Sequence, residues 1–161
     1  MDWLSTVDGW IRSVLNVVVI ISVVGLTGAM TIQVILRYFL QWSLMGVEEM
    51  STFFGLWLYF SGFALVSAHN QHIRGAFITS AMSHRAQDIT DRVVLAISGI
   101  LCLYFLILSL DYTAFVFDVN RRSTYLRWPT VLWVASLNVG LLLSVITFAI
   151  QAIVPSRKTA P

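Results

Sequence analysis

Hydrophobic residues in this chain gather in four long runs, and the charged residues lie in the short segments between them. The runs cover about residues 13–36, 50–68, 93–117 and 129–154. A helix rises ~1.5 Å per residue, so ~20 apolar residues cross the ~30 Å hydrocarbon core of a bilayer. The pattern therefore predicts four transmembrane helices in one domain that covers residues 1–161.

Two further segments have an amphipathic helical period instead of a continuous apolar run. They cover about residues 1–12, where Trp3 and Trp10 share the apolar side, and about residues 73–85. Short helices with this pattern lie in the headgroup layer, with tryptophan at the interface. A secretory signal fits the first segment poorly, because this segment carries two aspartates and the apolar run after it is too long.

Composition fixes the class of protein. Of 161 residues, 58% are hydrophobic and 11% are charged, whereas soluble domains carry roughly 25% charged residues. The mean hydropathy is +0.81, so the natural solvent of the chain is a bilayer and the predicted fold is an all-α integral membrane protein. A formal charge of +2 without a basic run gives no support for nucleic-acid binding. Cys102 is the only cysteine, so no internal disulfide forms.

Four spans place both termini on the same side of the membrane. That side carries six basic residues, namely Arg12, Arg74, Arg85, Arg92, Arg157 and Lys158, and the other side carries four, namely Arg37, Arg121, Arg122 and Arg127. Loops rich in lysine and arginine stay in the cytoplasm. The excess of basic residues on the side of the termini therefore predicts a multi-pass protein with cytoplasmic termini.

Glu48 and Glu49 come directly before the second run. Three interpretations stay open: a cation site, a helix start favoured by the helix dipole, or a strut in which one glutamate pairs with Arg37 across the first turn. The pair lies at the edge of the membrane and not at its midplane. This position favours the strut or a partner contact over ion transport.

Histidines give one candidate metal site and no candidate haem site. His69 and His72 are three residues apart, a spacing that metal ligands use on a helix, but only His84 is near enough to be a third ligand. A polar cap at the end of the second run is the alternative. Haem would need axial histidines inside the runs, and none contains one. We therefore expect no metal and no cofactor.

Polar residues inside the runs are few. Asp111 is the charged residue that lies deepest within an apolar run. It is either a functional carboxylate or a residue at the watery boundary of the third span. Asn138 and Gln151 are predicted to hydrogen-bond to neighbouring helices. Secondary transporters bind substrate near the midplane in broken helices, whereas these runs are continuous and almost without polar groups. Alone, the chain is not expected to transport anything.

Arg121, Arg122 and Arg127 make a basic connection between the third and fourth runs. Two interpretations stay open: the basic loop attracts an anionic solute or an acidic partner surface, or it is simply a solvated loop.

Several of these residues together resemble a known family. The residues that carry the resemblance are Arg37-Tyr38, Glu48-Glu49, Trp57, Gly62, His72-Ile73-Arg74 and Pro129, which opens the last run. In type and spacing they are similar to the small membrane subunit of the tripartite ATP-independent periplasmic (TRAP) transporters, the DctQ-like family. Two features depart from the family pattern: Gly75-Ala76 stands where Val-Asp is frequent, and a second proline is replaced near Asn138.

The resemblance implies an accessory role in a bacterial inner membrane. In that family a large, DctM-like membrane subunit carries an organic acid with sodium, and a soluble DctP-like periplasmic protein delivers the acid. The small subunit pairs with the large one, braces it among the membrane lipids and helps to receive the binding protein. The motif residues are then structural or contact the partner, and Arg121, Arg122 and Arg127 are candidates for docking the binding protein.

Two other classes of protein remain as alternatives. A stand-alone four-span exporter needs an acidic residue inside its first span, and residues 13–36 have none. A membrane enzyme or redox subunit needs a cluster of a nucleophile and a base, or cofactor ligands, and the sequence offers neither. No enzymatic activity is expected.

Overall fold

The computed structural model describes residues 2–42, 44–68 and 84–153, and these residues are almost entirely helical. The helices are α1 (Asp2–Phe39), α2 (Met45–Ala68), α4 (His84–Asp118) and α5 (Val131–Ile153). Each contains a segment long and apolar enough to cross a membrane. The predicted all-α fold with four membrane-spanning helices is confirmed.

Three helices begin earlier than the apolar runs indicate. The segment 1–12 is not a separate helix, because α1 continues through Arg12 without a break. No proline interrupts this stretch, and one glycine is tolerated inside a helix. α2 begins five residues before the second run, at Met45, and α4 begins at His84. Polar residues therefore extend the helices beyond their apolar segments and do not end them.

The second predicted interfacial helix, 73–85, lies mostly outside the described residues, as do His69, His72 and Arg74. Only its last two residues are described, and they form the start of α4. Where these amphipathic segments lie relative to a bilayer remains a prediction.

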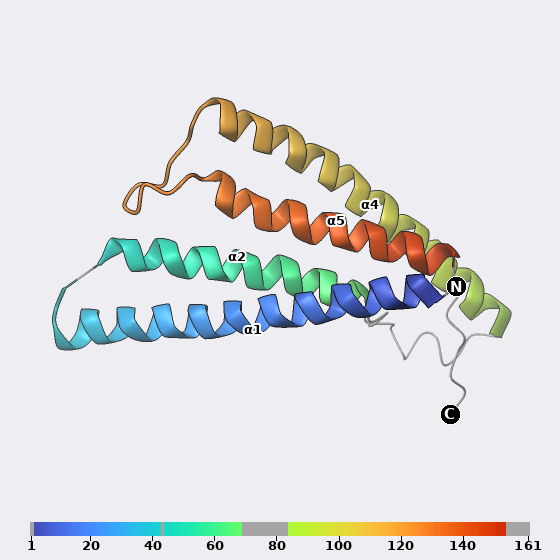
Figure 1. Cartoon of the computed structure of the whole chain (residues 1–161), viewed down its shortest axis with the longest axis horizontal. Coiled ribbons are helices and arrows are strands. Elements are labelled where there is room, and N and C mark those ends of the chain that lie inside the picture. Colours follow the sequence, from blue (N-terminus) through green and yellow to red (C-terminus); the bar gives the residue numbers. More distant parts are fainter. Residues whose placement is uncertain (1, 43, 69–83, 154–161) are drawn as a thin grey trace.

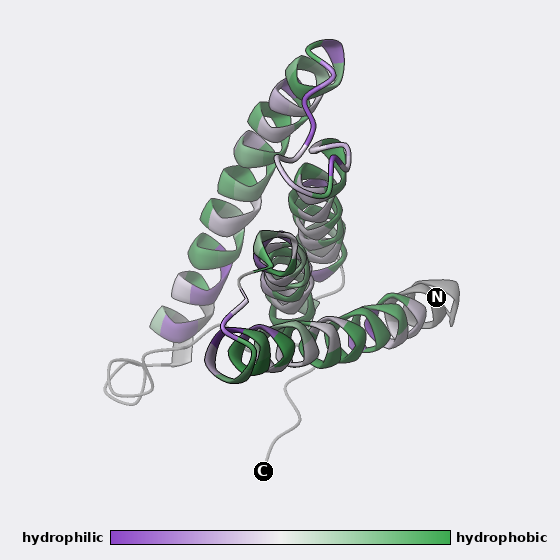
Figure 2. Cartoon of the chain, turned by 90° about the vertical axis from the view of Figure 1, so that its left-hand side faces the viewer, coloured by the Kyte–Doolittle hydropathy of each residue, from purple (hydrophilic) through white to green (hydrophobic). Residues whose placement is uncertain are grey.

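The helices form a fan (Figure 1). α1 and α2 lie side by side as an antiparallel hairpin, α5 packs on α2, and α4 packs on the other side of α5. α2 and α5 are the central pair, and α1 and α4 diverge on either side of it (Figure 2). The α1–α2 turn and the α4–α5 loop lie at the same end of the molecule.

Glycines set how closely the helices approach one another. A methyl group at Gly140 would lie 2.6 Å from the backbone oxygen of Phe60, so α5 touches the α2 backbone there. At Gly25 of α1 the space for a methyl group is filled by the ring of Phe54, whose nearest atom would be 2.6 Å away. Small residues let neighbouring membrane helices pack tightly, and Gly25 lets the Phe54 ring of α2 lie against the backbone of α1.

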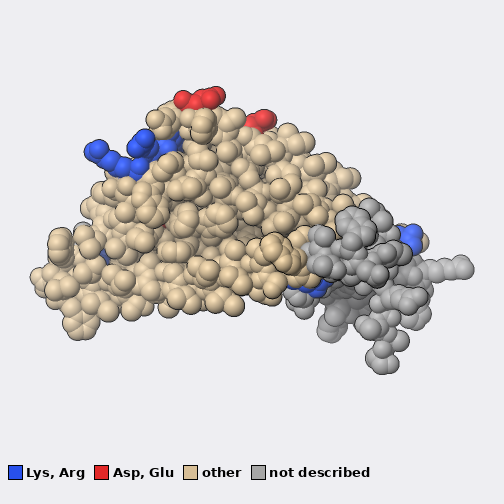
Figure 3. All heavy atoms as spheres, in the orientation of Figure 1, with Lys and Arg blue, Asp and Glu red and all other residues tan. Residues whose placement is uncertain are grey.

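Hydrophobic residues predominate along most of each helix (Figure 2), and many of them are exposed. Side chains such as Val24 and Ile100 are each 67% exposed, which in water would be an aggregating surface and in lipid is a solvated one. Lys, Arg, Asp and Glu are sparse on the face in Figure 3 and lie toward its ends and its upper edge. This distribution is that of a protein whose sides face hydrocarbon.

Candidate functional site

The connection between α4 and α5 is an ordered loop. Asn120 ends α4 in the left-handed conformation, with φ of 49°. The amide N–H of Asn120 donates to the carbonyl of Phe117, and that of Arg121 donates to the carbonyl of Val116. This pair of hydrogen bonds is the Schellman termination, in which asparagine is the usual substitute for glycine. The chain direction after α4 is therefore fixed by Asn120.

Beyond Asn120 the loop pairs with itself. Arg122 and Pro129 form an isolated antiparallel bridge, and Ser123 N–H donates to the carbonyl of Trp128 at 2.8 Å. Pro129 was predicted to open the last helix, but α5 begins at Val131. The proline lies in this bridge instead. It suits the position because it lacks an N–H and so leaves no donor unpaired there.

Glu49 of α2 holds this loop. Its carboxylate accepts hydrogen bonds from Ser123 Oγ at 2.6 Å, from the Leu126 N–H at 2.8 Å and from the Tyr125 N–H at 3.0 Å. Successive backbone N–H groups that converge in this way form an anion-binding concavity. We call this set of hydrogen bonds the Glu49 latch. It joins the start of α2 to the tip of the α4–α5 loop, about 75 residues apart in sequence.

An aromatic cluster lies beside the latch. The Phe53 ring packs on Trp57, Trp128 and Trp133, with ring centroids 6.2, 6.1 and 5.6 Å away. The contacts to Trp128 and Trp133 are edge-to-face, the arrangement that the ring quadrupole favours. The motif residue Trp57 thus belongs to a structural cluster that ties α2 to the loop and to α5.

Glu48 makes a different connection from its neighbour. Its Oε1 accepts a hydrogen bond from Gln33 Nε2 of α1 at 2.8 Å. The interpretation that pairs a glutamate with Arg37 is therefore wrong. A polar strut between α1 and α2 does exist, but its α1 residue is Gln33 and not Arg37. Gln33 lies one helical turn before Arg37. Arg37 and Tyr38 are exposed at the end of α1.

The arginines of the loop are exposed beside the latch. Arg121, Arg122 and Arg127, which we call the loop arginines, are all exposed, and Arg127 adopts a left-handed backbone with φ of 54°. Arg121 and Arg122 line a cleft of about 460 Å³ together with Glu48 and Glu49. Basic residues gather on this end of the molecule (Figure 3). The latch therefore fixes the loop from which these cations project.

Polar groups deep in the bundle bond to one another. The side-chain amide of Asn138 donates to Thr113 Oγ1 at 2.7 Å, and its carbonyl oxygen accepts from Ser109 Oγ. Gln151 Nε2 donates to the backbone carbonyl of Ser67 at 2.8 Å. The prediction that Asn138 and Gln151 bond to neighbouring helices is confirmed. These polar groups join α4 to α5 and α5 to α2.

The remaining candidates do not form a shared site within the described part of the chain. Asp111 is exposed, and α4 continues past it to Asp118. Both interpretations of Asp111, as a functional carboxylate or as the watery boundary of the third span, remain predictions. Among the described residues, no three His, Cys, Asp or Glu side chains are close enough to hold a metal ion. A methyl group added at Gly62 would have nothing within 4 Å, so packing inside the chain does not require a glycine there.

Sequence reasoning missed four residues that matter for this geometry: Gln33, Ser123, Trp133 and Gly140. Each acts through a contact with a residue distant in sequence, which periodicity does not reveal. The available signals were a polar Gln33 inside an apolar run and a glycine in the middle of the last run.

Comparison with known proteins gives one result. The family described as "Tripartite ATP-independent periplasmic transporters, DctQ component" matches residues 26–158. Neither the curated proteins nor the solved structures contain a match. The matched segment covers most of the chain and includes the Glu49 latch, the aromatic cluster and the greater part of the helical fan. The chain therefore belongs to the DctQ family, the small membrane component of the TRAP transporters.

Proposed function

We propose that this chain is the non-transporting subunit that braces the large membrane subunit of a sodium-coupled TRAP transporter for organic acids. In this proposal the large subunit carries the acid and the sodium ions. The small subunit stays rigid beside it in the inner membrane and has its termini in the cytoplasm. Its loop arginines contribute to docking the periplasmic solute-binding protein.

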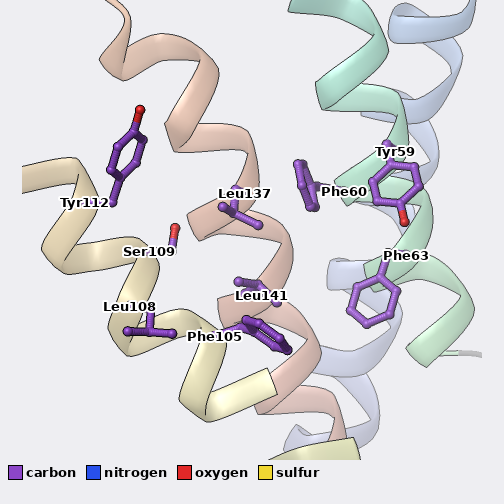
Figure 4. Close-up of a pocket in the computed structure, with 9 residues that line it drawn as sticks. All are labelled: Tyr59, Phe60, Phe63, Phe105, Leu108, Ser109, Tyr112, Leu137 and Leu141. Atoms are coloured by element: carbon purple, nitrogen blue, oxygen red, sulfur yellow. The ribbon is translucent and has the colours of Figure 1, made fainter. Parts of the chain in front are cut away.

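The observation that carries the bracing role is an apolar groove between α2 and α4, with α5 as its floor. It has a volume of about 500 Å³, and its lining comes from all three helices, as Figure 4 shows. We call it the α2–α4 groove. Aromatic side chains dominate it, including Tyr59, Phe63 and Phe105. Aromatic residues are enriched where proteins contact one another.

Tyr59 supports a protein occupant over lipid tails. It lies nine residues before the end of α2, which at ~1.5 Å per residue is close to the middle of a ~30 Å core. The residue is 70% exposed, and its hydroxyl has no hydrogen-bond partner among the described residues. A hydroxyl in hydrocarbon without a partner costs several kcal/mol, roughly 4–8 on alkane scales. A polar group of a partner helix would remove that cost.

Gly55 and Gly62 point to the same face. They lie four residues before and three residues after Tyr59, so the three residues share one side of α2. A methyl group added at either glycine would have no neighbour within 4 Å. Small residues on an open helix face allow the backbone of another membrane helix to come close. We infer that this face of α2 receives a helix of the large subunit.

Interior chemistry supports the non-transporting part of the proposal. The side-chain amide of Asn138 is used in bonds to α4. Gln151 Nε2 donates to Ser67 and Gln151 Oε1 is buried without a partner, but Gln151 lies two residues from the end of α5, away from the midplane. A substrate site needs several polar groups that converge on a ligand near the midplane, and the exposed hydroxyl of Tyr59 is a single such group. Glu48 and Glu49 are likewise engaged in contacts within the chain.

Co-purification tests the bracing role. A tagged chain, co-expressed with the large subunit and extracted in mild detergent, is expected to retain that subunit. Gly62→Leu fills an open position and leaves the internal packing intact, so we expect about tenfold less large subunit to be retained, consistent with loss of a close helix contact. The matched control is Val24→Phe, an enlargement on exposed α1. Bracing would be refuted if the wild-type chain came out alone, and the assigned face would be wrong if only the control released the partner.

A further inference from the structure

A second groove is lined by α4 and α5 alone and has an arginine at one end. It has a volume of about 470 Å³, and we call it the α4–α5 groove. Four small residues shape it: Ala96 and Gly99 on α4, and Ala149 and Ala152 on α5. The buried ring of Phe148 contributes to the lining. The groove is thus an apolar furrow along two adjacent helices.

One end of the furrow is basic and lies level with the helix ends. Arg92 lines the groove together with Gln151 and Ala152 of the last turn of α5. Gln151 bonds to the carbonyl of Ser67 near the end of α2, so α2 and α5 end at the same height. Helices of 24 and 23 residues just cross a core of ~30 Å plus part of the headgroup layers. Arg92 therefore lies at headgroup level.

Arg92 is available to an anion at this position. Its side chain is exposed, and it has no hydrogen-bond or ion-pair partner among the described residues. The neighbouring carboxylate, Asp91, does not line the groove. From Arg92 the furrow runs toward the middle of the membrane as far as Leu103, eleven residues further along α4, or roughly 16 Å. A cation at headgroup level above an apolar furrow matches a phosphate joined to an acyl chain.

The packing of the helices around each groove distinguishes a lipid from a helix as the occupant. A helix with its side chains is about 10–12 Å across. Next to the furrow α4 and α5 are in direct contact, since a methyl group at Gly99 would lie 3.7 Å from Phe148 Cβ. The α2–α4 groove, by contrast, lies between helices that α5 separates. We therefore assign the furrow, which follows two helices in contact, to an acyl chain, and the α2–α4 groove, which lies between separated helices, to a helix.

We propose that the α4–α5 groove is a binding site for an anionic phospholipid. One acyl chain lies in the furrow over Gly99 and Phe148, and the guanidinium of Arg92 donates to the phosphate. Guanidinium binds phosphate through paired, charge-assisted hydrogen bonds, which a zwitterionic headgroup weakens by bringing its own cation. The site would hold the cytoplasmic end of α4 against α5.

Native mass spectrometry of the full chain tests the site. The protein is purified in detergent and mixed with equal amounts of phosphatidylglycerol and phosphatidylcholine. We expect the wild-type chain to retain phosphatidylglycerol preferentially, and Arg92→Gln to lower the ratio of the two bound lipids by about tenfold, as expected for loss of a charge-assisted pair. Arg121→Gln, which removes the same charge at the other end of the molecule, is the control and should leave the ratio unchanged.

A second variant tests the furrow itself. Ala96 is exposed, so Ala96→Phe fills the groove from the outside and is expected to reduce retention of both lipids several-fold, since the acyl chain loses its contacts. Equal retention of both lipids by the wild type would overturn the proposal, as would an unchanged ratio in Arg92→Gln. Release of the large subunit by Ala96→Phe, with lipid retention unchanged, would assign the groove to a protein partner and also overturn it.

Discussion

Gly140 offers the sharpest test of the helix arrangement. In Gly140→Ala the new methyl carbon would lie 2.6 Å from the Phe60 carbonyl oxygen and 3.0 Å from its carbonyl carbon. Both are backbone atoms, which unlike a side chain cannot rotate away. Carbon atoms pack comfortably at ~3.5–4.0 Å, so α2 and α5 must separate by nearly 1 Å. The single methyl group thus disturbs the central pair of the fan.

The size of the effect follows from overpacking. Forcing a methyl group into a filled contact typically costs about 1–3 kcal/mol of stability. Alanine is a better helix former than glycine, and this difference offsets at most about 1 kcal/mol of that cost. We therefore expect Gly140→Ala to lower the free energy of unfolding by about 0–2 kcal/mol relative to the wild type. Relative to a glycine-to-alanine variant at an open position, which gains the same helix propensity, the loss should be about 1–3 kcal/mol. The loss should be smaller at Gly25→Ala, because the obstruction there is the ring of Phe54, which is able to turn.

Unfolding in mixed micelles with increasing sodium dodecyl sulfate, followed by tryptophan fluorescence, measures this loss. The matched controls are Gly99→Ala, where the nearest atom would be 3.7 Å away, and Gly55→Ala, where nothing lies within 4 Å. Both should unfold at the wild-type midpoint or slightly above it. If Gly140→Ala were as stable as these controls, α2 and α5 would not approach as closely as the structure has them.

Three further predictions concern the polar contacts. Glu49→Gln places an amide donor against the loop N–H groups, so amide hydrogen exchange in residues 123–126 should accelerate several-fold, whereas Glu48→Gln should leave it unchanged. Asn138→Leu breaks both bonds to α4 and should lower the free energy of unfolding by about 1 kcal/mol; no loss would show that the network is not formed. Replacing the loop arginines with glutamine should weaken solute-binding-protein affinity at low salt and flatten its salt dependence; an unchanged salt dependence would remove them from docking.

Much of the fold follows from the hydrophobic pattern. Four apolar runs in a sparsely charged chain form four helices in a bilayer, because lipid offers no hydrogen-bond partner for exposed backbone groups. The pattern does not determine where a helix ends. α4 ends at Asp118, where the left-handed Asn120 and backbone hydrogen bonds turn the chain away. α1 continues through Arg12 because a change in polarity alone does not break a helix. Helix ends are set by local backbone geometry, which hydropathy does not report.

The candidate site was predictable in its position but not in its contacts. The sequence places Glu48 and Glu49 at a helix start near the first turn, and this is where the latch forms. Adjacent residues on a helix point about 100° apart, so the two carboxylates reach different sides of α2. One meets Gln33 and the other meets the loop. Which glutamate faces which partner depends on the rotation of α2, and only tertiary packing fixes that rotation.

Uptake into proteoliposomes tests the central claim most directly. Vesicles that contain only this chain, given an inward sodium gradient and a radiolabelled organic acid with its binding protein, should take up no more acid than empty vesicles. Vesicles that also contain the large subunit should accumulate the acid, and those with the large subunit alone should accumulate much less. Sodium-driven uptake by this chain alone would contradict the account.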